Sequence, residues 1–174
     1  RSGDIVLKKG TLVRPQDLAI LAMAGHTSVK AGKQPVVSVI SSGNELVEPS
    51  IKPGLSQIRN TNSYQLMAQI ESAGGIGKYL GIAKDDEDVT FDIISQAISQ
   101  SDVVLITGGV SMGDFDFVPL VLQRAGVRLL FSRINIQPGK PVTFGTHKKA
   151  LVFGLPGNPV SSFIQFELLV RPLL

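Results

Sequence analysis

The fold is decided by the segment Leu105-Ile106-Thr107-Gly108-Gly109-Val110-Ser111-Met112-Gly113-Asp114-Phe115-Asp116. The apolar, β-branched run that leads into it, residues 103–106, is typical of a short buried strand. Residues 117–125 follow it with apolar side chains at helical spacing. A strand that runs through a glycine-rich loop into a helix presents free backbone N–H groups at the positive end of the helix dipole. The segment therefore predicts a strand, a loop suited to an anion, and a helix.

The same alternation of strand, polar loop and helix extends from residue 36 to the end of the chain. Apolar patterning predicts strands over 36–40, 79–82, 103–107, 129–132, 142–144 and 151–155. Helical spacing predicts helices over 63–73, 89–99 and 117–125, and a last one after residue 158. Asn62 is predicted to cap the first of these helices. Such alternation favours an α/β fold with three layers, in which helices cover both faces of a mostly parallel sheet.

The N-terminal segment does not follow this pattern. It predicts two short strands, residues 5–7 and 11–13, and a helix from Pro15 to about Ala24. We expect residues 1–34 to be the tail of a preceding domain and residues 35–174 to be the α/β domain.

Composition restricts the class of protein. Of 174 residues 43% are hydrophobic, the net charge is +3, and there is no cysteine. A mild excess of scattered Lys and Arg suits an anionic small molecule and argues against nucleic acid. The absence of cysteine removes disulfides and thiolate metal sites. It also fits a cytoplasmic protein, which is the location we expect. Because neither a signal peptide nor an apolar run of membrane-spanning length is seen, we expect no membrane partner.

Four polar loops follow predicted strands, at residues 41–45, 84–86, 107–116 and 156–161. In parallel sheets, ligands bind beyond the carboxyl ends of the strands. The sequence therefore predicts that these loops meet at one edge and form a site.

The loop after the central strand carries candidate ligand-binding residues. Gly108, Gly109 and Gly113 permit positive φ and close backbone approach to a ligand, and Ser111 adds a hydroxyl. A tight strand-to-helix turn would explain the same glycines. Asp116 precedes the helix directly, so its spacing favours an N-cap.

Charged candidates lie in other loops. Glu45 and Asp85 at two strand ends, together with Asp116, could hold Mg²⁺ or position water, although each alone is an ordinary surface acid. Lys140, in the turn 137–141, could pair with a phosphate as a point charge.

The last loop, Pro156-Gly157-Asn158-Pro159, is a rigid helix start. Asn158 is predicted to cap the helix, Pro159 to occupy its first position, and Ser161 to expose a hydroxyl toward the same crevice. A purely structural role is equally consistent with this pattern.

Together these motifs resemble one family, the MoeA-type molybdopterin molybdenumtransferases, which include the E domain of gephyrin. The resemblance covers the whole chain and depends on five loops in the family's order and spacing, at residues 41–46, 85–86, 108–116, 138–141 and 155–161.

The resemblance implies a molybdopterin-binding α/β domain fold and a role in molybdenum cofactor biosynthesis. Members insert molybdenum from molybdate into adenylylated molybdopterin and release AMP, assisted by a divalent cation such as Mg²⁺, and act as homodimers of a longer chain. By position, Glu45, Asp85 and Asp116 match family acids that matter for activity, the first two as metal ligands. The remaining matches line the substrate crevice: Gly108, Gly109, Ser111, Gly113, Lys140, Pro156, Gly157, Asn158, Pro159 and Ser161.

The chain departs from the family pattern at four positions. Asn44 and Asn60 stand where Asp is common, and Arg133 and Gln137 where Lys is common. One alternative is a non-catalytic module for pterin binding or oligomerisation. Another is the molybdopterin adenylyltransferase branch, against which the continuation at residues 111–116 argues.

Overall fold

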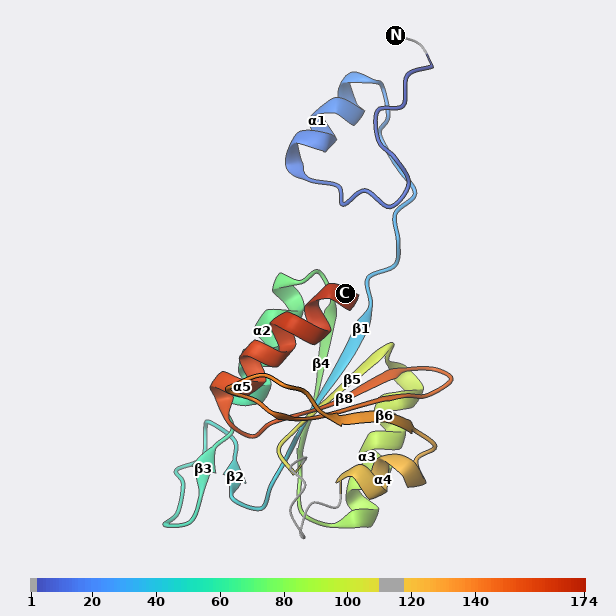
Figure 1. The fold of residues 1–174 in the computed structure, drawn as a ribbon. Helices are drawn as coiled ribbons and strands as arrows, with labels where there is room; N and C mark the ends of the chain where they lie inside the picture. The colour runs from blue at the N-terminus through green and yellow to red at the C-terminus, as the bar shows by residue number, and fades with distance from the viewer. Residues whose placement is uncertain (1–2, 110–117) are drawn as a thin grey trace. The chain divides into compact units, whose positions relative to one another are not determined.

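A computed structural model describes residues 3–109 and 118–174 (Figure 1). The chain divides into two compact units, Arg1–Lys33 and Gln34–Leu174. The first unit contains helix α1, Pro15–Met23, as predicted, and the Asp17 carboxylate accepts a hydrogen bond of 2.9 Å from the Arg14 backbone N–H at its start.

The two strands predicted in the first unit are wrong, because its described residues contain no strand. The apolar side chains of the two segments are exposed, 77% for Ile5 and 82% for Leu12. An isolated pair of three-residue strands has no face to bury, so it does not form in water.

The second unit is built on a six-stranded sheet of order β4-β1-β5-β8-β7-β6. The pairs β1–β4, β1–β5 and β5–β8 are parallel, whereas β7 is antiparallel to both β8 and β6. Five of the strands therefore point the same way, and the predicted mostly parallel sheet is confirmed. The strands are β1 Val36–Ser42, β4 Ile76–Ala83, β5 Val103–Thr107, β6 Arg128–Arg133, β7 Pro141–Thr146 and β8 Leu151–Leu155.

Helices cover both faces of this sheet, which confirms the three-layer fold (Figure 1). Helices α2 and α5 lie on one face, and α3 and α4 on the other. The helices are α2 Asn62–Ser72, α3 Glu87–Gln100, α4 Val118–Arg124 and α5 Pro159–Gln165, the last continuing as a π-helical turn, Phe166–Val170, and a 3-10 turn, Arg171–Leu173.

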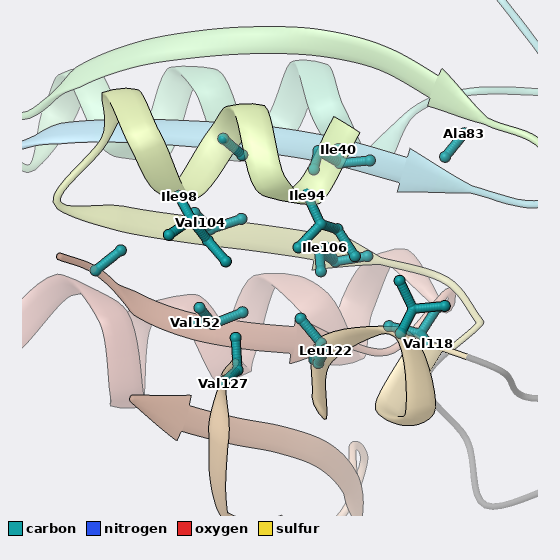
Figure 2. Packing of buried hydrophobic residues seen from close by; sticks show 13 residues of the cluster. Ile40, Ala83, Ile94, Ile98, Val104, Ile106, Val118, Leu122, Val127 and Val152 are labelled. Atoms are coloured by element: carbon teal, nitrogen blue, oxygen red, sulfur yellow. The ribbon is translucent and has the colours of Figure 1, made fainter. Parts of the chain in front are cut away.

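Successive side chains of the central strand, β5, point alternately into the two helix layers. In β5, Val104 and Ile106 pack against α3 and α4, as Figure 2 shows, whereas Val103 and Leu105 face the other layer. All four are buried, and each such side chain stabilises the fold by about 1.5–3 kcal/mol. A strand covered on both faces is apolar throughout, which is why residues 103–106 could be recognised in the sequence.

Two features of the connection between β1 and α2 were not predicted correctly. A small parallel pair, β2 Leu46–Val47 and β3 Ile58–Arg59, lies within it, and two-residue strands are too short to show periodicity. The N-cap of α2 is Thr61 rather than Asn62, whose side chain binds other loops instead. No helix in the described residues is long and apolar enough to cross a membrane.

Candidate functional site

The described loops that were predicted to converge leave from neighbouring strand ends. Ser42 pairs with Ala83, Ser41 with Thr107, and Thr107 with Leu155, so the ends of β4, β1, β5 and β8 are level. Because β7 is antiparallel to β8, the turn before it, which holds Lys140, enters at the same edge. We call this the carboxyl edge of the sheet.

Glycines bring the loops after β5 and β8 into contact at this edge. Gly108 has φ +89°, and a Cβ there would lie 2.3 Å from the Ser42 carbonyl oxygen. Gly109 has φ +61°, and its neighbour in space is the Ser42 side chain. A Cβ on Gly157 would lie 3.8 Å from the Gly108 Cα. Gly108 is therefore required both by its backbone conformation and by its closeness to β1.

Asn62 joins the same two loops from the first turn of α2. Its Nδ2 donates to Thr107 Oγ1 at 2.7 Å and to the Gly157 carbonyl at 2.9 Å, and the Pro156 carbonyl lies at 3.4 Å. The Thr107 hydroxyl donates in turn to the Pro156 carbonyl at 3.1 Å. Sequence reasoning missed this role, since an Asn beside a helix start is normally assigned to capping.

The capping at residues 156–161 is as predicted. Asn158 Oδ1 accepts from the backbone N–H groups of Val160 and Ser161 at 3.0 and 3.1 Å, and Pro159 is the first helical residue. Ser161 is only 5% exposed, and a Cβ added to Gly139 would lie 3.3 Å from the Cβ of Ser161. The Gly139 turn therefore packs against the Cβ of Ser161.

A second buried amide holds the turn that carries Lys140. Gln165 is fully buried, and its Nε2 donates to the carbonyls of Gly139 and Pro141, on either side of Lys140. The Lys140 carbonyl accepts from the Ile134 N–H at 3.1 Å. The Lys140 side chain is exposed and forms an ion pair with none of the described carboxylates. Its ammonium is therefore available to an anion.

The predicted acids lie on the other side of the glycine loops. Asp85 and Asn44 bind each other, with Asn44 N donating to Asp85 Oδ2 at 3.3 Å and Asp85 N to Asn44 Oδ1 at 3.2 Å. The Glu45 carboxylate folds over Gly43, where a Cβ would meet its Oε2 at 2.5 Å. Both acids are exposed. In contrast, Asp86 Oδ1 accepts from Asp88 N and Val89 N and so caps α3.

The described residues contain no cluster of three His, Cys, Asp or Glu side chains placed to hold a metal ion. Glu45 and Asp85 still have the oxygen chemistry that Mg²⁺ accepts, which is one or two carboxylates completed by water and phosphate oxygens. The third predicted acid, Asp116, lies outside the described residues, together with Ser111 and Gly113.

Another buried amide, Asn60, belongs to a hydrogen-bonded chain beside the edge. Ser41 Oγ donates to Asn60 Oδ1 at 3.0 Å, Asn60 Nδ2 to the Tyr79 hydroxyl at 2.7 Å, and that hydroxyl to Glu48 Oε1 at 2.7 Å. Burial, and then the Glu48 carboxylate, raise the pKa of Tyr79 far above its ordinary value. These hydrogen bonds connect Glu48, which follows β2, to Tyr79 in β4 and to β1, and none of them involves the glycine loops.

The order of the strands separates the charges along the edge. Acids follow β1 and β4, the glycine loops follow β5 and β8, and Lys140 precedes β7. An elongated anionic ligand can therefore lie across backbone glycines, with one end near a cation and the other near carboxylates.

Known proteins are similar to this chain in sequence and in fold. Residues 38–174 match the family described as "Probable molybdopterin binding domain". The chain is 39% identical over 176 residues to the molybdopterin molybdenumtransferase of Bacillus subtilis. The aligned region covers 100% of this chain and 40% of that protein. The Staphylococcus aureus (strain Mu50) protein of the same name is 38% identical over 173 residues, and this aligned region covers 99% of this chain and 41% of that protein.

A solved structure agrees with these relatives. The molybdopterin biosynthesis MoeA protein from Pyrococcus horikoshii superposes with a TM-score of 0.85 at 38% identity, over 97% of this chain and 41% of that one. The chain thus spans about two fifths of the length of the relatives it matches. Because the family match runs from β1 to the last residue, the chain belongs to the family of probable molybdopterin binding domains.

Proposed function

We propose that this chain is the molybdopterin-binding part of a molybdenum cofactor biosynthesis enzyme. The reaction is insertion of molybdenum from molybdate into adenylylated molybdopterin, with release of AMP. Relatives that are named molybdopterin molybdenumtransferase and match the whole chain at 38–39% identity support this reaction. From the sequence resemblance we also propose that the longer protein is a cytoplasmic homodimer.

The arrangement of the carboxyl edge is the observation that carries the proposal. Gly108 and Gly157 let an anionic pterin approach the backbone, and Lys140 lies beyond them with no described acid to neutralise it. A cation beside a phosphate forms charge-assisted hydrogen bonds, which are about twice as strong as neutral ones. Lys140 would therefore hold and orient the phosphate end of the substrate.

Glu45 and Asp85 would hold a magnesium ion at the opposite end of the edge. When bound there, Mg²⁺ would neutralise charge on the substrate's phosphate oxygens. The reciprocal bonds between Asn44 and Asp85 fix the two loops against each other, so that both carboxylates remain on the solvent side of the edge.

The pterin-binding part of the proposal is tested with the 174-residue chain and anaerobic molybdopterin in a titration. Lys140→Ala should raise the Kd by about 10- to 100-fold, since a hydrogen bond to a charged group contributes about 1.5–3 kcal/mol. Lys148→Ala is the matched control, because Lys148 is an exposed lysine in the turn between β7 and β8, at the opposite edge. Equal effects of the two changes would show that Lys140 does not bind the substrate.

Metal transfer is tested in the longer protein, by molybdate-dependent release of AMP from adenylylated molybdopterin. Asp116→Ala is expected to abolish this release. If the unaltered protein binds molybdopterin but never releases AMP, the alternative of a non-catalytic pterin-binding module applies. Asn44, an amide where the resembled family commonly has an acid, is the observation that favours this alternative.

A further inference from the structure

We propose that Asn62 is a positioning residue, which holds the loop after β8 and the end of β5 in the conformation that receives the pterin. The inference depends on the proposed function and adds a residue that the sequence motifs did not assign to the site. Asn62 is buried in the first turn of α2, and its side chain would influence the pterin only indirectly, through its hydrogen bonds to Thr107 and to the loop after β8.

The hydrogen bonds of Asn62 lead directly to the loop. Its amide has two N–H groups, and the two shortest contacts are Thr107 Oγ1 at 2.7 Å and the Gly157 carbonyl at 2.9 Å. The hydroxyl of Thr107 then donates to the Pro156 carbonyl at 3.1 Å. One amide therefore satisfies two consecutive carbonyls, one directly and one through Thr107.

Side-chain packing cannot hold Gly157 in place. Gly157 has no side chain and is exposed, so only hydrogen bonds to its main chain can restrain it. The restraint matters because Gly157 faces Gly108, and the next residue, Asn158, caps α5. A shift of the Gly157 carbonyl would therefore change the separation between the two glycine loops.

Asn62 does not cap helix α2, and the Ser63 backbone N–H of the first turn donates to Asn60 Oδ1 at 3.4 Å instead. The N-cap of α2, Thr61, accepts no hydrogen bond from a backbone N–H of the first turn, although Thr is a residue that commonly caps, and its hydroxyl donates to Asn62 Oδ1 at 3.4 Å. The Asn62 oxygen accepts from the Thr61 hydroxyl rather than from a backbone N–H of the helix, and its amide nitrogen donates to Thr107 and Gly157. This use of a polar side chain favours a role at the loops over a role in the helix.

Asn62→Asp is the sharpest test, because it keeps the size of the side chain and removes both N–H donors. We expect the Kd for molybdopterin to rise at least about tenfold, since a carboxylate would repel the carbonyl that the amide now binds. The matched control is Asn60→Asp. Asn60 is also a buried amide at the start of α2, but it donates to Tyr79 and not to the loops, so the Kd should change by less than about twofold.

Stability separates positioning from a merely structural role. Both variants should lower the melting temperature, whereas only Asn62→Asp should weaken binding when both are measured in the folded state. An unchanged Kd in folded Asn62→Asp would overturn the inference. Failure of the unaltered chain to bind molybdopterin would instead overturn the proposed function on which the inference depends.

A second pair of variants applies if Asn62→Asp does not fold. Thr107→Val removes the hydroxyl that relays to the Pro156 carbonyl, and Thr107→Ser keeps it. Weaker binding by the valine variant, with near-normal binding by the serine variant, supports the inference. Equal Kd values for the two would contradict it.

Discussion

Substitution of Gly108 by alanine tests whether the glycine loop is fixed by contact with β1 or only by its backbone conformation. Gly108 has φ +89°, and an added Cβ would lie 2.3 Å from the Ser42 carbonyl oxygen. Real Cβ atoms do not approach this closely, and the obstacle is main chain within a central strand. Either β1 or the loop after β5 must move.

Two costs combine in Gly108→Ala. A non-glycine residue in the left-handed region costs about 1–2 kcal/mol. Forcing an extra carbon into a packed place costs about 1–3 kcal/mol more. Gly74 supplies the matched control, since its φ is +86° and an added Cβ would meet nothing within 4 Å. Gly74→Ala should therefore be destabilised only by the first of these costs, that of the backbone conformation.

Urea unfolding of the two variants measures the difference. We expect Gly108→Ala to be less stable than Gly74→Ala by about 1–3 kcal/mol, with similar dependence on denaturant. The clash should also displace the loop, so molybdopterin affinity should fall for the first variant alone. Equal losses of stability in the two variants would refute the claim that contact with Ser42 constrains Gly108.

Three other predictions follow from single contacts. Gln165→Leu removes the donor to the carbonyls on either side of Lys140; it should cost about 1–3 kcal/mol in urea unfolding and weaken molybdopterin binding in a titration. Burial and the Glu48 carboxylate raise the pKa of Tyr79, so its contribution to stability should be complete below pH of about 10 and be lost as the pH rises toward the folded-state pKa. Tyrosinate absorbance against pH, with and without urea, measures this shift, and Glu48→Gln should reduce it. Asp86→Ala should destabilise the chain by about 1 kcal/mol through loss of the α3 cap, with molybdopterin affinity unchanged.

Local patterning was sufficient for the strands of the six-stranded sheet and for the helices that cover it, but not for the short pair β2 and β3. The apolar run at 103–107 and the helix start at Asn158 and Pro159 were predicted correctly, because burial on both faces and capping leave signals within a few residues. The convergence of the described loops also followed, since parallel strands joined by helices place their carboxyl ends together. The strands at residues 5–7 and 11–13 failed for the opposite reason, because the apolar side chains of these two segments are mostly exposed within the described residues of the first unit.

Only the tertiary structure decided how the loops are held and ordered. Asn62 and Gln165 bind carbonyls 95 and 26 residues away in the chain, and no spacing rule connects them to those partners. The buried state of Ser161 and the position of Lys140 across the glycine loops from the acids likewise depend on strand order. A buried polar group takes whichever partner the fold brings near, because leaving that partner unpaired is costly. The sequence by itself therefore determined which loops meet at the carboxyl edge, whereas long-range packing determined what fixes them in place.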